Sequence, residues 1–123
     1  MKLLSILTIS VCLGMLYPAS DTKPYVADIE TETSNKITTF TGYFQNDSST
    51  PVRLVYRLTM ERKGRSGQSS TSQGGVFAAE PGQRVSLSQL QVNVTDEDTY
   101  TVTLRIYSGQ ELVAKKLIKS SLH

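Results

Sequence analysis

Alternation of apolar and polar side chains with a period of two is the feature that most limits the fold of this chain. The segment VRLVYRLTMER, from Val52 to Arg62, separates its side chains into two sets, and TYTVTLRIY, from Thr99 to Tyr107, does the same. The first segment alternates Val52, Leu54, Tyr56, Leu58 and Met60 with Arg53, Val55, Arg57, Thr59 and Glu61. Because successive side chains of a strand point to opposite faces, each segment predicts a strand with one face in a core.

Five further segments have the composition of strands, and turn residues separate most of them. They are residues 25–33, 36–45, 75–79, 84–94 and 111–119, with turn sequences TSN, NDSSTP, AEPGQ, TDED and SGQ between the strands. No segment shows a long helical period. Seven short antiparallel strands in a chain of 123 residues predict an all-β fold, an immunoglobulin-like antiparallel β-sandwich.

A local signature supports this fold class. The sequence DEDTYTV, from Asp96 to Val102, resembles the acidic turn and tyrosine that enter the sixth strand of immunoglobulin domains. Tyr100 is then the candidate tyrosine corner, and Val102 stands where a disulfide cysteine often lies. The alternative is that Tyr100 is an ordinary inward-facing aromatic residue after an acidic turn. Both interpretations retain the strand.

The N-terminal twenty residues have the features of a cleaved secretory signal peptide. Lys2 precedes a short apolar run and then PAS, which predicts a leader over residues 1–20 and a single exported domain over residues 21–123. The expected cleavage follows Ala19 or Ser20. A lipidated Cys12 is the alternative, although Val11 is a poor residue in front of a lipidation site. Because Cys12 is the only cysteine, the exported domain has no disulfide. After the leader is cleaved, the domain is not expected to stay inserted in a membrane.

The segment GRSGQSSTSQGG, from Gly64 to Gly75, is polar and lies between two predicted strands. A linker between domains does not fit, because the chain is about the length of one domain. Glycine frees the backbone, and serine and threonine hydroxyls bond local backbone groups. The segment is therefore predicted to be a long loop or irregular edge within the domain.

Basic residues gather along and after the third predicted strand. Of 13 Lys and Arg residues, Lys2 leaves with the leader, so 12 basic residues face 11 acidic ones and the net charge conceals local concentrations. The candidate binding residues are Arg53, Val55, Arg57, Arg62, Lys63 and Arg65. A basic strand face steers an acidic unfolded partner at long range. The alternative is a solvated face whose charges only prevent aggregation between sheet edges. Tyr107 would add apolar contact if its strand adjoined Val55.

Other kinds of site have little support in the sequence. Asp96, Glu97 and Asp98 lack a calcium-binding loop and are interpreted as a solvated turn. His123 has no catalytic partners, and no serine lies in a nucleophile elbow. The balanced charge does not favour nucleic acid. We therefore expect no enzyme, no cofactor and no metal.

The run YRLTMERKGRSGQSSTSQGGVFAAEPGQ, from Tyr56 to Gln83, resembles the small exported curli-assembly proteins of the CsgH type, structural relatives of CsgC. The resemblance implies an immunoglobulin-like periplasmic domain that keeps the curli amyloid subunit, unfolded or in early oligomers, from polymerising too soon. It also implies action at low ratios through transient contact. The CsgC branch carries a C-x-C pair that this chain lacks, so no thiol chemistry transfers.

Two alternatives remain open at this point. The same sandwich suits an exported structural or adhesive module of the cell surface. A client strand could also pair with an exposed sheet edge, instead of meeting a basic face through weak electrostatic capture. We expect the exported protein to be a monomer.

Overall fold

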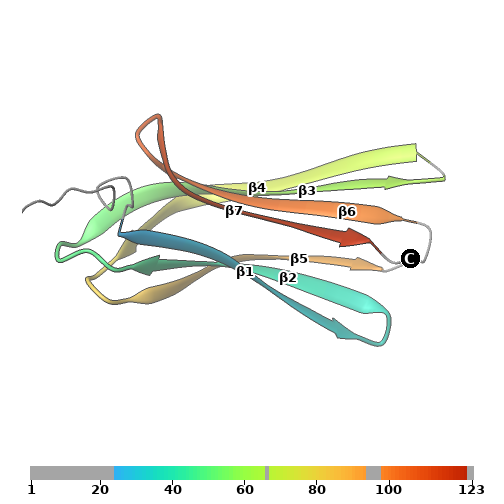
Figure 1. Ribbon diagram of the computed structural model, residues 1–123, viewed down its shortest axis with the longest axis horizontal. Helices are drawn as coiled ribbons and strands as arrows, with labels where there is room; N and C mark the ends of the chain where they lie inside the picture. Colours follow the sequence, from blue (N-terminus) through green and yellow to red (C-terminus); the bar gives the residue numbers. More distant parts are fainter. Residues whose placement is uncertain (1–23, 66, 94–97, 122–123) are drawn as a thin grey trace, which may run out of the picture.

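The computed structural model describes residues 24–65, 67–93 and 98–121, and these form seven strands. Figure 1 shows the strands as two facing layers. Every pairing between strands is antiparallel. The strands are β1 (Tyr25–Ser34), β2 (Ile37–Asn46), β3 (Val52–Gly64), β4 (Gly67–Ala79), β5 (Arg84–Asn93), β6 (Thr99–Ser108) and β7 (Glu111–Ser121). The predicted all-β class and the number of strands are confirmed.

The strands divide into a three-stranded sheet of order β1-β2-β5 and a four-stranded sheet of order β4-β3-β6-β7. Each sheet therefore has two edge strands and an outer face directed away from the other layer. In β3 and β6 the predicted inward and outward faces are confirmed. Leu58 and Leu104 are fully buried between the layers, whereas Arg53 and Arg57 are exposed.

The core lies between the two sheets and draws on both. Phe40 and Phe44 come from β2, and Phe77 packs edge-on against Phe44 with ring centroids 5.0 Å apart. Burying such a side chain contributes about 1.5–3 kcal/mol relative to leaving it exposed. The buried apolar residues are Ile29, Phe40, Phe44, Leu54, Leu58, Met60, Ala79, Leu90, Val92, Tyr100, Val102, Leu104, Ile106 and Val113. The alternating pattern of the sequence thus becomes one shared core.

The prediction of a long loop over Gly64–Gly75 is wrong. Strand β3 continues to Gly64 and β4 begins at Gly67, so the two form one long hairpin that pairs without a bulge from Val52 opposite Ala79 to Gly64 opposite Gly67. The turn is confined to this tip, where Gly67 has a φ of 126° that suits glycine. Backbone pairing with β3 determines the strand here, and it needs no apolar side chain.

The turn before β6 also differs from its interpretation as a solvated turn. Asp98 is buried and accepts a 2.9 Å hydrogen bond from Arg62 Nε. Asp96 and Glu97 lie outside the described residues. Tyr100 donates its hydroxyl to the carbonyl of Asn93, seven residues upstream, at 2.9 Å. This is the hydrogen bond of a tyrosine corner, as predicted.

The predicted leader over residues 1–20, with Cys12 in it, lies outside the described residues. The described residues contain no helix of the length and hydropathy needed to cross a membrane.

The assignment of the two-sheet fold to the immunoglobulin-like class stays a prediction.

Candidate functional site

The register of the four-stranded sheet brings exposed or half-buried apolar side chains from four strands together on its outer face. Val55 lies between Val76 of β4 and Tyr107 of β6, and Tyr107 lies opposite Leu112 of β7. We call these four residues the apolar row. Val55, Val76 and Leu112 keep 40%, 58% and 43% of their surface exposed. A continuous apolar line across a sheet is typical of a contact surface, whereas scattered exposed apolar residues are ordinary.

A line of cations lies directly beside the apolar row. Arg57 of β3 is opposite Arg105 of β6, which is opposite Lys115 of β7. We call these three residues the basic row. Like charges placed opposite each other destabilise a sheet, so strand pairing alone does not explain this arrangement. A partner that brings negative charge to the face would turn the repulsion into attraction.

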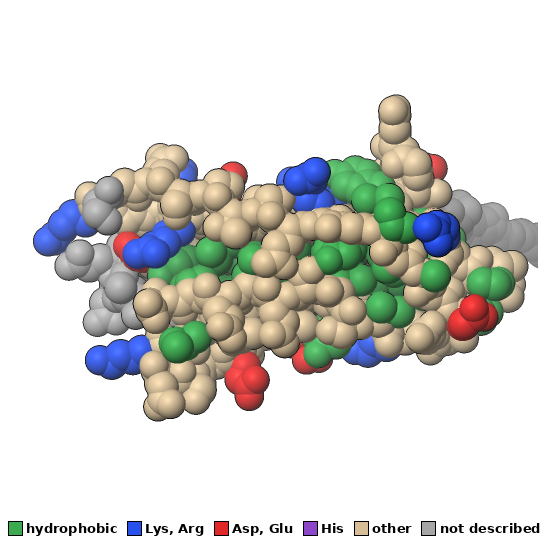
Figure 2. Space-filling model, turned by 180° about the vertical axis from the view of Figure 1, so that it is seen from behind, with side chains coloured by type: hydrophobic (Ala, Val, Ile, Leu, Met, Phe, Trp, Pro, Cys, Tyr) green, Lys and Arg blue, Asp and Glu red, His purple; other side chains and the backbone are tan. Residues whose placement is uncertain are grey.

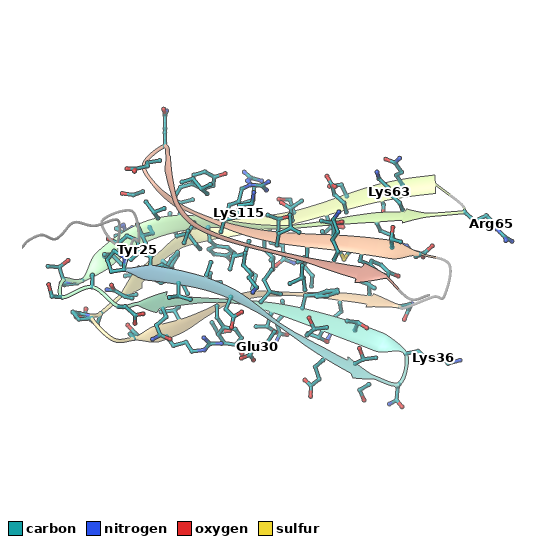
Figure 3. All side chains as sticks on the ribbon, in the orientation of Figure 1. Tyr25, Glu30, Lys36, Lys63, Arg65 and Lys115 are labelled. Atoms are coloured by element: carbon teal, nitrogen blue, oxygen red, sulfur yellow. The ribbon has the colours of Figure 1, made fainter. Side chains whose placement is uncertain are left out.

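Arg53 lies on the other side of the apolar row, two residues before Val55 on the same face of β3. Figure 2 shows a hydrophobic patch along the upper edge of the molecule with Lys or Arg side chains on both sides of it. In Figure 3, Lys115 lies over the middle of the upper layer and Lys63 toward the tip of the β3–β4 hairpin. The face is therefore basic along much of its length.

A shallow hollow of about 560 Å³ opens where the apolar and basic rows meet. Its lining includes Val55, Arg57 and Tyr107. Gly74 creates the space, because it lies opposite Arg57 and carries no side chain to fill the position. A Cβ atom there would lie only 2.7 Å from the carbonyl oxygen of Tyr56, so any residue other than glycine would force the backbone to shift. Arg57 Nη1 donates to Ser72 Oγ at 3.0 Å, which holds the guanidinium over β4.

The structure brings together three of the six residues named from the sequence, Arg53, Val55 and Arg57. Lys63 is on the same outer face, six residues beyond Arg57. Tyr107 was expected to add apolar contact only if its strand adjoined Val55. Strand β6 does adjoin β3, and it pairs Tyr107 with Val55.

Arg62 and Arg65 are placed differently. Arg62 lies on the inward-facing set of β3 and forms an ion pair with the buried Asp98, with Nη2 and Oδ2 2.9 Å apart. It therefore ties the hairpin to the start of β6 and does not belong to the outer face. Arg65 lies in the turn between β3 and β4, at the tip of the hairpin in Figure 3.

Sequence reasoning missed the contributions of β4 and β7 to this surface and, apart from Tyr107, that of β6. The missing members are Val76, Arg105, Leu112 and Lys115. The alternation of β6 placed Arg105 on its outward face, but only the register shows that it meets Arg57. The two glycines before Val76 gave the one signal of an open space.

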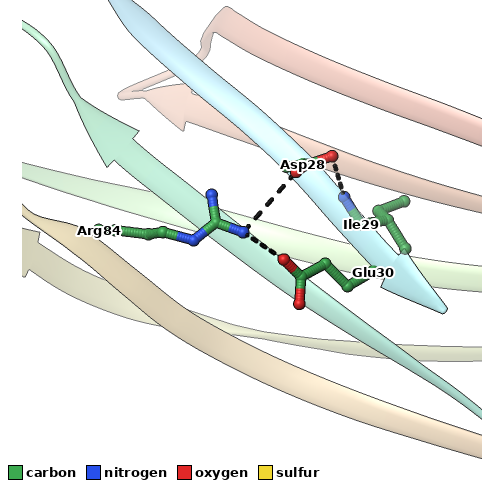
Figure 4. A network of polar contacts seen from close by, with 4 residues as sticks. All are labelled: Asp28, Ile29, Glu30 and Arg84. Carbon is green, nitrogen blue, oxygen red and sulfur yellow. Dashed lines mark hydrogen bonds and ion pairs between the residues drawn. The ribbon is translucent and has the colours of Figure 1, made fainter. Parts of the chain in front are cut away.

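The outer face of the three-stranded sheet has the opposite charge. Asp28, Glu30 and Glu32 lie two residues apart on β1. Arg84 of β5 reaches across to Glu30 at 2.9 Å and to Asp28 at 3.7 Å, as Figure 4 shows. Its guanidinium carbon also lies 4.2 Å from the centre of the Tyr43 ring. The main cation of this face is thus engaged within the molecule.

Metal coordination gains no support from the structure. Across the described ranges, no group of three or more His, Cys, Asp or Glu side chains is placed to hold a metal ion.

Comparison with known proteins identifies the family. A family model described as CsgH protein matches residues 26–116, which is most of the chain. The chain belongs to the CsgH family. The resemblance drawn from residues 56–83 is therefore confirmed. A search of curated proteins gave no significant match.

Solved structures of curli proteins share the fold. The E. coli curli protein CsgC matches with a TM-score of 0.64 and 19% identity, covering 76% of this chain and 96% of CsgC. The solution structure of R. palustris CsgH matches with a TM-score of 0.57 and 21% identity, covering 74% and 89% of the two chains. At these identities the likeness shows the fold alone.

The same architecture occurs inside larger proteins. A β-glucuronidase of glycoside hydrolase family 2 matches with a TM-score of 0.54 and 11% identity, over 82% of this chain but only 13% of that protein. Only a small part of the hydrolase chain is covered, so this match also shows the fold alone. This CsgH-family chain is a curli-associated protein, and the residues that the structure describes form seven antiparallel strands in two sheets.

Proposed function

We propose that this CsgH-family protein is exported to the periplasm and keeps the curli amyloid subunit from polymerising before it leaves the cell. The single observation that carries the proposal is the alignment of the basic row beside the apolar row on one outer face. Family membership supplies the curli context. The proposal assigns no catalytic step, cofactor or metal to the domain.

The two rows act at different distances. Arg53, Arg57 and the other outward cations attract an acidic, unfolded client over about 10 Å at 0.1 M salt and raise the encounter rate. The apolar row then supplies contact area at short range. Because the hollow is shallow and exposed ion pairs contribute little binding energy, we expect the contact to be brief. One protein molecule can therefore act on many subunits in turn.

Two structural features support the finer assignment to the immunoglobulin-like class. One is the tyrosine corner at Tyr100. The other is the strand order, which matches the constant-type arrangement except that β4 pairs with β3 instead of joining the sheet of β1, β2 and β5.

The proposal also includes export and oligomeric state: residues 1–20 are the export signal, and the exported domain is a monomer.

The test is the polymerisation of a purified curli subunit, followed by thioflavin fluorescence with the exported protein present at a molar ratio far below one. The proposal predicts a longer lag with the unmodified protein and loss of most of that delay with Arg53→Ala/Arg57→Ala. It also predicts that added salt shortens the delay, because salt screens exposed charges.

A matched control removes two positive charges elsewhere. Lys36→Asn/Arg84→Ala takes them from the β1–β2 turn and the other outer face, and asparagine suits the φ of 68° at position 36. This control is expected to inhibit like the unmodified protein. Absence of any delay at equimolar protein would refute the function and favour an exported structural or adhesive module.

A further inference from the structure

The four sheet edges of this molecule differ in how they are protected. Exposed edges present unpaired backbone groups, and proteins usually guard them with charge, proline or bulges. Three of the four edge strands carry charged side chains. Strand β1 has Asp28, Glu30 and Glu32, β5 has Arg84 at its start, and β7 has three lysines. Strand β4, GQSSTSQGGVFAA, carries no charge and no proline across 13 residues and pairs with β3 without a bulge.

The outer half of β4 is also open on both faces. The eight residues from Gly67 to Gly74 are all exposed, although alternate side chains point toward the side of the second sheet. In Figure 1 the tip of the β3–β4 hairpin reaches beyond the end of β5. On its far side no described strand pairs with β4. This half of the strand is therefore supported by β3 alone and has a free edge.

Two hollows lie beside β4, over the side of the strand that pairs with β3. The first is the one at Gly74 and Gly75, and the second, of about 380 Å³, is lined in part by Gln68, Ser69 and Ser70. Gly74 and Ser70 lie opposite Arg57 and Glu61, so both belong to the outer face. Four residues of extended chain separate them, about 13 Å. On a strand added along β4, two outward side chains four residues apart would lie beside these positions, and long side chains there would reach across β4 toward the hollows, as in recognition by strand addition.

We propose that the free edge of β4 accepts an extended strand of the client, and that this strand is rich in uncharged polar residues. The proposal rests on the proposed function and adds how the client is held. Side chains of β4 at this edge are serine, threonine, glutamine and glycine, which pair across strands with similar residues through hydroxyl and amide hydrogen bonds. Acidic groups flanking that client strand meet the cations of β3.

Charge favours a client over a second copy of this protein as the occupant. Pairing β4 with β4 of another molecule would set two basic outer faces side by side, with Arg57 and Lys63 of each copy one strand away from the junction. Like charges brought together in this way oppose association. A polar client with acidic flanks experiences attraction at the same place.

The deciding experiment adds charge to the edge and leaves the outer face untouched. Thr71→Lys/Gln73→Lys places two lysines on exposed positions of β4 that point away from the basic row. If strand addition holds the client, the variant needs roughly fivefold more protein for the same lag, the effect of two lost cross-strand pairs of typical strength. If electrostatic attraction alone acts, two extra positive charges preserve or strengthen inhibition, and that result overturns the inference.

The control and a direct measurement complete the test. Ser86→Lys/Gln89→Lys adds the same charge to exposed positions of β5 and is expected to inhibit like the unmodified protein. Amide hydrogen exchange with the purified subunit present should slow in β4 and not in β7; unchanged exchange in β4 refutes the inference. Sedimentation of the protein alone gives the monomer mass, and a dimer dissociated by Thr71→Lys/Gln73→Lys would instead assign the edge to a second copy. Failure of the unmodified protein to delay polymerisation refutes the function itself.

Discussion

The two outer faces of this molecule are built on the same pattern and carry opposite charge. On the four-stranded sheet, outward positions bring Arg57, Arg105 and Lys115 into line beside exposed apolar side chains. On the three-stranded sheet, Glu30 and Asp28 share Arg84. The near-balanced net charge hides this difference. A small, nearly neutral domain can thus be strongly polarised, and we expect only one side to meet a negative client.

The largest expected effect comes from inverting the charge of the basic row. Arg57→Glu/Arg105→Glu turns attraction for an acidic client into repulsion, and we expect at least about a tenfold loss of potency in the polymerisation assay, within the range by which charge steers association. Both side chains lie on the outer surface of the sheet, so circular dichroism should show the fold unchanged.

The matched inversion is on the opposite face. Glu30→Lys/Glu32→Lys changes the charge by the same amount with the other sign, on the outer side of β1. If this variant changes potency as much as the inversion on the four-stranded sheet, the two faces are functionally equivalent and the comparison fails.

A smaller effect is expected from the apolar row. Val55→Ser/Val76→Ser removes apolar surface that is already half exposed, so potency should fall roughly fivefold while the free energy of unfolding stays within about 1 kcal/mol. Val26→Ser is the control, because Val26 is similarly exposed on the other outer face. Equal potency of all three proteins would restrict the interaction to charge.

The smallest effect concerns the acidic face. Arg84→Ala removes the contacts with Glu30, Asp28 and the Tyr43 ring, and the free energy of unfolding should fall by about 1 kcal/mol, as for exposed ion pairs with one aromatic contact. Inhibition should not change. A thermal melt and the polymerisation assay measure the two quantities on one sample, and a loss of potency would place function on this face too.

The sequence predicted best where burial determines structure. Alternation in β3 and β6 predicted both strands and their inward faces, because only one register buries Leu58 and Leu104. The same parity places Arg62 on the inward set, apart from Arg53 and Arg57. The prediction that grouped Arg62 with Arg53 and Arg57 on one binding face did not apply this alternation.

The rest of the site depends on pairing between distant segments. Arg57 and Arg105 are far apart in the chain, and no local pattern shows that they become neighbours. The Gly64–Gly75 segment was predicted to be a loop because its side chains are polar on both faces of the strand. Such a strand shows no alternation of apolar and polar residues in the sequence.

The hairpin of β3 and β4 has a further consequence for how relatives can diverge. In its outer half, residues 67–74 of β4 pack against no second layer, so opposed pairs of residues can be inserted beside the turn without shifting the side chains of Leu54 or Phe77 in the core. Its length is then free to drift, or to be selected, independently of the rest of the fold. We therefore expect the length of the β3–β4 hairpin to vary among proteins of this architecture while the core is retained.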